Sequence, residues 1–222
     1  MMHRRSVSLA YWPMARARAL TILAAASVVF ATRLGSDARA DATTDESVTY
    51  FVAEGSPGSG FREGDRQLAI WALEAWDRQA RPELELTPGD EESATIRVYW
   101  VRADEGLYGE MRPRRIGDRV GADVFIRPDL RGLGSDIETA AADDPLFRET
   151  IVYLTCVHEL GHAFGLPHTS AFADIMYSFQ FGGDFVAYFR RFRDQLGERE
   201  DIPSASPFSA ADIAALRRLG PP

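Results

Sequence analysis

The chain has 222 residues, 45% of them hydrophobic and 26% charged, which is enough for one domain with a substantial core. Residues 1–40 hold six of the 25 basic residues but one of the 33 acidic residues, so residues 41–222 carry a net charge of −13, against −8 for the whole chain. A body this acidic repels nucleic acid and anionic lipid, and we therefore expect no nucleic-acid partner.

Residues 1–40 have the pattern of an export signal. An uncharged apolar run of 13 residues, 19–31, follows several arginines and precedes Ala38-Arg39-Ala40, a small-x-small pattern typical of signal cleavage. Such a run is short for a membrane span, which needs about 20 residues. We predict a signal peptide at 1–40 and a functional domain at 41–222 that is secreted, periplasmic or on the cell surface. The alternative is an uncleaved N-terminal anchor, the one case in which we expect contact with a membrane.

Three segments rich in β-branched and aromatic residues are predicted to be strands: 47–53, 95–101 and 121–127. Four segments with apolar residues at helical spacing are predicted to be helices: 65–79, 146–164, 185–196 and 208–219. We interpret the stretches between them as loops, including the acidic, glycine-containing stretch 131–145. The sequence has no internal repeat, so these elements are expected to form one domain.

The helix predicted at 146–164 carries a constellation with clear chemistry, His158-Glu159-Leu160-Gly161-His162. The two histidines are four residues apart, so their imidazoles leave the same face of the helix one turn apart and can reach one ion. Glu159 lies beside the first of them, where its carboxylate can hold a water molecule next to the metal. Two ligands alone do not complete a zinc site.

The next residues supply a third ligand. Gly165 can adopt a positive φ, so the helix can end there and the chain can turn sharply, and Pro167 stiffens the exit. His168 can then return to the metal, which gives three neutral imidazoles and an open fourth position, the pattern of a catalytic zinc site. Three of the four histidines of the chain fall within this eleven-residue window, which argues against isolated core or surface histidines.

The segments His158–His168 and Asp174–Tyr177 resemble the metzincin clan of metallopeptidases and, within it, the matrixin-like members. The resemblance implies an α+β zincin-type fold, with a twisted mixed β-sheet, an active-site helix, a second packing helix and a C-terminal helix. It also implies that Met176 belongs to a tight Met-turn, which lies beneath the metal without binding it.

The same resemblance implies the roles of the site residues. One catalytic Zn²⁺ is expected on His158, His162 and His168, with Glu159 as the general base and acid of an endopeptidase that hydrolyses peptide bonds with a zinc-activated water. Its partner would be a peptide or protein substrate, extended along an edge strand that we expect within residues 108–127. A monomer is the default expectation.

The sequence departs from the family pattern in its cysteine and its histidines. Cys156 is the only cysteine. It is two residues from His158 and points away from the ligand face, so we interpret it as a buried structural thiol rather than a cap on the zinc. No histidine remains for a second, structural zinc. Calcium is a second candidate cofactor, but we favour a solvated acidic loop as the explanation of its candidate ligands: Asp136, Glu138, Asp143 and Asp144.

The aromatic segment 179–196 and the overall function each leave alternatives open. The aromatic residues can form a specificity pocket or lid, or they can pack a helix onto the body, which is the interpretation that we favour. The protein can also be a catalytically silent zinc-containing binding protein, a membrane-tethered interaction domain, or a zinc hydrolase of another substrate. The presence of Glu159 argues against a silent site.

Overall fold

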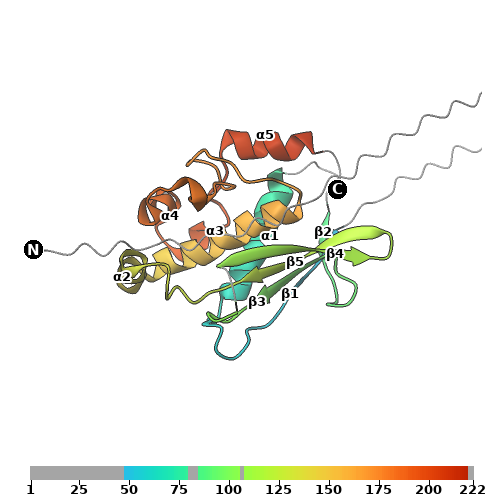
Figure 1. Cartoon of the computed structure of the whole chain (residues 1–222), viewed down its shortest axis with the longest axis horizontal. Coiled ribbons are helices and arrows are strands. Elements are labelled where there is room, and N and C mark those ends of the chain that lie inside the picture. Colours follow the sequence, from blue (N-terminus) through green and yellow to red (C-terminus); the bar gives the residue numbers. More distant parts are fainter. Residues whose placement is uncertain (1–47, 80–84, 106–107, 220–222) are drawn as a thin grey trace, which may run out of the picture. The chain divides into compact units, whose positions relative to one another are not determined.

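The structure, a computed structural model, describes residues 48–79, 85–105 and 108–219 (Figure 1). The predicted signal peptide or anchor at 1–40 lies outside these residues. Within them, no helix combines the length and the apolar character that crossing a membrane requires.

The described residues contain a five-stranded sheet with the order β2-β1-β3-β5-β4. Its strands are β1 (Val48–Val52), β2 (Leu86–Pro88), β3 (Ile96–Trp100), β4 (Gly109–Ile116) and β5 (Arg119–Ile126). Four strands pair in parallel, whereas β4 runs antiparallel to β5, from Gly109 opposite Ile126 to Ile116 opposite Arg119. β4 is therefore an edge strand within residues 108–127, the range in which the family resemblance placed one, although the residue pattern predicted no strand at 109–116.

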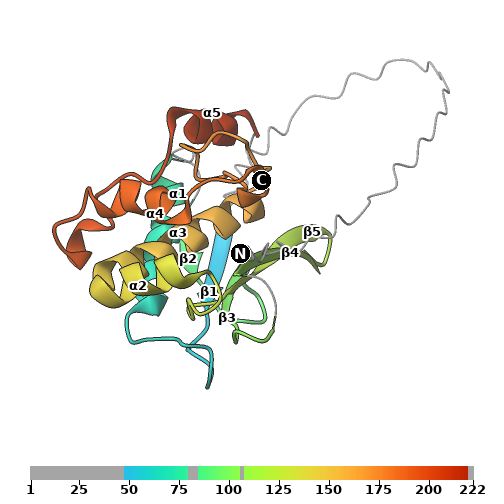
Figure 2. The ribbon, with the colours of Figure 1, turned by 60° about the vertical axis from the view of Figure 1, so that its left-hand side comes forward.

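The helices of the described residues are α1 (Asp65–Gln79), α2 (Ser135–Asp143), α3 (Pro145–Ala163), α4 (Phe185–Arg193) and α5 (Ala210–Arg218). Two single turns of 3-10 helix, η1 (Phe179–Phe181) and η2 (Arg199–Asp201), flank α4. α1 and α3 lie on one face of the sheet, and α4 and α5 lie on the side of α3 away from the strands, as Figure 1 and Figure 2 show.

The core lies between the sheet and the two helices that cover it. Alternate residues of the central strands are buried, as the two-residue period of a strand requires: Ile96, Val98, Trp100, Ala122, Val124 and Ile126. The indole N–H of Trp76 in α1 donates to the Val157 carbonyl in α3 at 2.8 Å. A buried ion pair between Arg148 of α3 and Asp65 of α1 forms a second tie between the two helices. The helix that carries the histidines is thus fixed at two points.

The structure confirms the α+β class and the mixed sheet, and it corrects the sequence predictions at three places. Residues 131–145 are not all loop, because α2 occupies most of them. The stretch between 101 and 121 holds β4, and the short β2 was not predicted. β4 escapes prediction because Pro113 and three arginines interrupt the alternation of apolar residues. An edge strand tolerates such a proline, since the strand has no neighbour on one side.

Candidate metal and catalytic site

α3 ends directly after the H-E-x-x-H segment, and a glycine makes the turn. Gly165 has a φ of 92°. Its N–H donates to the His162 carbonyl at 2.9 Å, and the Leu166 N–H donates to the Gly161 carbonyl at 2.9 Å. These two bonds are those of a Schellman motif, in which a residue in the left-handed conformation satisfies the last carbonyls of a helix.

The turn carries the chain back so that His168 faces the two helical histidines. The Thr169 N–H donates to the Met176 carbonyl at 2.8 Å, which holds the residue next to His168 in place. Nε2 of His168 lies 3.1 Å from Nε2 of His158 and 3.1 Å from Nε2 of His162. In the part of the chain that the structure describes, these three side chains are the one group of His, Cys, Asp or Glu that could hold a metal ion.

Backbone carbonyls orient the two helical imidazoles. Nδ1 of His158 lies 2.7 Å from the Ile175 oxygen, and Nδ1 of His162 lies 2.8 Å from the Leu166 oxygen. A carbonyl only accepts, so each Nδ1 carries the proton and each Nε2 presents a lone pair. Burial lowers the pKa of all three imidazoles, that of His158 to about 3 with a further contribution from His162. All three are therefore neutral, as metal ligands must be.

This donor set fits a zinc ion. Neighbouring nitrogens of a tetrahedral site are about 3.3 Å apart when each Zn–N bond is about 2.0–2.1 Å, and the separations here are 3.1 Å. Lone pairs that converge this closely repel each other unless a cation lies between them, and neutral imidazole is a preferred zinc ligand. Three protein ligands leave the fourth position for water or substrate.

Glu159 lies beside the triad and against the edge strand. It is buried, and a Cβ atom on Gly109 of β4 would lie 2.5 Å from its Oε1. Burial and, second, the charge of Glu110 raise the pKa of Glu159 to about 8, while a hydrogen bond from the Met111 N–H lowers it. A dication on the histidines would lower this pKa further, because it stabilises the carboxylate.

Met176 packs beneath α3. Its side chain is 1% exposed. A Cβ atom on Gly161 would collide with Met176 Sδ and approach Trp76 Cζ2 to 3.0 Å. α5 anchors the turn, because Asp212 Oδ2 accepts the Ile175 N–H at 2.9 Å. The structure thus gives Met176 a packing contact with the helix that bears two of the histidines.

The aromatic segment packs mainly on the body of the protein, which confirms the interpretation that the sequence favoured. Tyr188, Phe189 and Phe192 of α4 are buried. The Tyr188 hydroxyl lies 3.2 Å from the Ile175 carbonyl, the same oxygen that His158 contacts. In contrast, no residue of the 3-10 turn η1, which precedes α4, is buried.

Cys156 and the acidic residues have structural roles. Cys156 is fully buried as expected, and burial raises the pKa of its thiol. Glu138 accepts the Gly132 N–H at 2.8 Å. Asp144 caps the N-terminus of α3 and pairs with Arg193 of α4 at 2.8 Å. Protein donors thus already engage two of the four candidate calcium ligands.

Sequence reasoning missed three residues that shape the site: Gly109, Met111 and Asp212. Ser209 and Asp212 form a capping box at the start of α5, and this S-x-x-D pattern could have drawn attention to Asp212. No pattern in the neighbouring sequence identifies Gly109, because it contacts Glu159 only through the packing of the sheet on α3.

The comparisons point to one family. The sequence model of the matrixin peptidase family matches residues 42–182. This range is more than half of the chain, and it contains all five strands, the first three helices, the three histidines and Met176. No curated protein matches the sequence at a significant level.

Proposed function

The chain belongs to the matrixin family of zinc metallopeptidases, and we propose that it is a secreted zinc endopeptidase that uses its histidine triad and Glu159. One observation carries the proposal: three neutral imidazole nitrogens converge next to a buried carboxyl group. The family match and the geometry of the three histidines are independent observations, and both support zinc-dependent peptide hydrolysis.

His158, His162 and His168 would hold the metal, and backbone carbonyls orient two of these imidazoles. A zinc ion there would polarise the scissile carbonyl and bring the pKa of a water molecule toward about 7. The Ile175 and Leu166 carbonyls keep the Nδ1 protons of His158 and His162, so both Nε2 lone pairs stay directed at one point. No protein nucleophile is needed.

Glu159 moves the proton in the proposed mechanism. Its carboxylate accepts a proton from the attacking water and passes it to the leaving amine. Gly109 leaves the room that this carboxyl group occupies between α3 and β4, because a Cβ atom there would overlap Oε1, Cγ and Cδ of Glu159. A zinc ion on the histidines would lower the pKa of this buried carboxyl group, so that the carboxylate form that accepts the proton is populated at neutral pH.

The substrate is proposed to bind along β4. This strand ends the sheet on the side of Glu159, and its outer edge can pair with an extended peptide by β-augmentation. The scissile bond would then lie near Gly109 and Met111, next to the triad.

Export and domain organisation are part of the proposal. The apolar run and the small-x-small pattern in residues 1–40 favour a cleaved signal followed by a catalytic domain at 41–222. Mass measurement of the N-terminus after expression in an exporting host tests this proposal. A chain that begins near Asp41 supports it, and an intact chain in the membrane fraction supports the tethered alternative.

The activity is tested by replacing Glu159 and leaving the metal ligands intact. We expect zinc-loaded protein to cleave members of a diverse peptide library. Glu159→Ala should bind one zinc and keep its fold, but its kcat should fall by at least about a hundredfold because the proton acceptor is lost. Near-wild-type turnover by this variant refutes the assigned role. A folded, zinc-bound wild type that cleaves no peptide favours the silent binding protein instead.

A further inference from the structure

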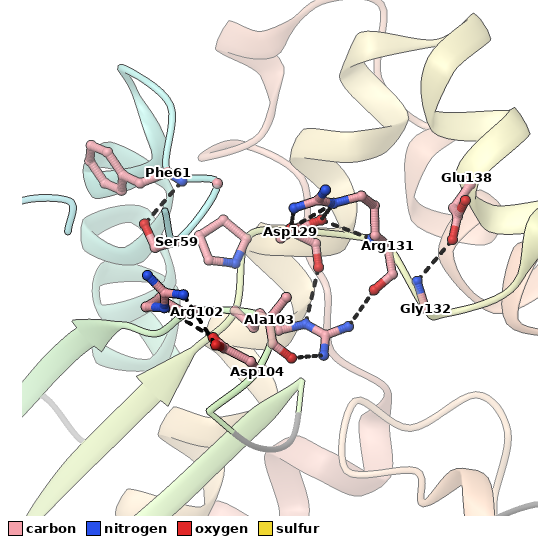
Figure 3. A network of polar contacts seen from close by, with 12 residues as sticks. Ser59, Phe61, Arg102, Ala103, Asp104, Asp129, Arg131, Gly132 and Glu138 are labelled. Atoms are coloured by element: carbon pink, nitrogen blue, oxygen red, sulfur yellow. Dashed lines mark hydrogen bonds and ion pairs between the residues drawn. The ribbon is translucent and has the colours of Figure 1, made fainter. Parts of the chain in front are cut away.

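Arg127, the residue directly after β5, joins two loops near the start of β4. Its guanidinium group donates to three backbone carbonyls: Nε to Asp129 at 3.1 Å, Nη1 to Ala103 at 3.3 Å and Nη2 to Arg131 at 2.8 Å. These bonds belong to the polar network of Figure 3, where the three acceptor residues are labelled. One side chain thus connects the loop after β3 with the loop after β5.

Backbone carbonyls and an aromatic ring surround this guanidinium. Its acceptors are carbonyl oxygens, the Tyr108 ring lies 4.5 Å from its central carbon, and no ion pair within the described ranges involves Arg127. The Asp129 carboxylate binds the side chain and the N–H of Arg131 instead. Three donors of the arginine fork therefore satisfy three backbone carbonyls at once.

The same arginine is linked to the proposed catalytic carboxylate through β4. Its guanidinium lies against the Tyr108 ring, and the Tyr108 hydroxyl donates to the Asp129 carbonyl at 2.9 Å, the same oxygen that Arg127 Nε contacts. The next residue, Gly109, is the one that packs against Glu159. A shift of Tyr108 therefore shifts the backbone that confines the carboxyl group.

We propose that the Arg127 side chain holds the loop after β3 against the loop after β5, a contact that we call the loop closure, and that it is the positioning residue that fixes the start of β4 against Glu159. The positioning part of this inference rests on the proposed function, whereas the loop closure does not.

Hydrogen exchange on the full, zinc-loaded chain tests the loop closure. Arg127→Met keeps the length of the side chain but removes every donor, and it should speed exchange of the amides at 108–111 and 129–132 by about tenfold or more. Arg127→Lys keeps the charge but lacks the fork, so it should recover only part of the protection. Arg102→Met is the control, because Arg102 is an exposed arginine paired with the exposed Asp104. Unchanged exchange in Arg127→Met, or full recovery in Arg127→Lys, overturns the proposal.

Kinetics test the positioning role. Arg127→Met should lower kcat about tenfold while KM changes less than about threefold and the zinc content stays at one per chain, because the histidines lie on α3 and its following turn. An unchanged kcat refutes the positioning role. If the wild type hydrolyses no peptide, the proposed function fails, and the exchange experiment still decides whether Arg127 closes the loops.

Discussion

Replacing Gly109 by alanine should remove activity without removing the fold. The added Cβ atom would lie 2.5 Å from Oε1, 2.7 Å from Cγ and 2.9 Å from Cδ of Glu159. Non-bonded carbon atoms normally stay about 3.5–4.0 Å apart, so the carboxyl group must retreat by about 1 Å. A misplacement of that size can cost about a hundredfold in rate, or about 2.7 kcal/mol of transition-state stabilisation.

The free energy of unfolding of Gly109→Ala should change little, for two reasons. The atoms that clash are at the far end of a flexible side chain, and alanine suits a strand better than glycine does. The assay is kcat/KM on a peptide that the wild type cleaves, together with zinc content and melting temperature. Gly117→Asn is the matched control, because Gly117 lies at the tip of the same hairpin with a φ of 59° and no atom within 4 Å of an added Cβ, and asparagine tolerates this conformation. A kcat/KM for Gly109→Ala within about threefold of wild type would refute the reasoning.

Two further substitutions should act on stability, each through a different contact. Gly161→Ala places a methyl group against Met176 and Trp76, and it should destabilise the protein by about 1–3 kcal/mol in urea unfolding, because this part of the core is already filled; an unchanged midpoint would show that Met176 can move aside. Asp144→Ala removes the cap of α3 and the partner of Arg193, and it should cost about 1–2 kcal/mol at neutral pH. Burial acts to raise the pKa of Asp144, but the Arg193 side chain and the helix N–H groups outweigh it, so the pKa is lowered on folding. The contribution of this carboxylate is therefore complete above its unfolded pKa of about 3.9 and is lost as the pH falls through its lower folded pKa. Unfolding of wild type and Asp144→Asn should accordingly converge at acid pH, and a gap that persists at the lowest pH would contradict the assignment.

The histidine triad could be read from the sequence because its geometry is local. His158 and His162 share a helix face by their spacing, and Gly165 allows the turn that returns His168 within a few residues. The hydrogen bonds at the end of α3 and the 3.1 Å separations of the Nε2 atoms follow from this short-range pattern. The strongly periodic helices and the β-branched strands were predicted for the same reason.

The features that escaped prediction depend on residues far apart in the sequence. Gly109 meets Glu159 because β4 pairs with β5 and the sheet packs on α3. β4 forms because it pairs with the neighbouring strand β5. Its proline and arginines break the alternation of apolar residues, so the sequence pattern did not predict a strand there. Arg127 looked like an ordinary strand-end residue, and its three carbonyl contacts appear only when two loops come together.

The most direct test of the account is to follow peptide hydrolysis while zinc is returned to the metal-free chain, with His162→Ala in parallel. The account predicts that activity rises linearly, reaches its maximum at one zinc per chain, and is absent from the variant, which should have lost tight binding. Hydrolysis by zinc-free protein, equal activity in His162→Ala, or a folded chain that binds one zinc on the triad and cleaves no peptide would contradict it.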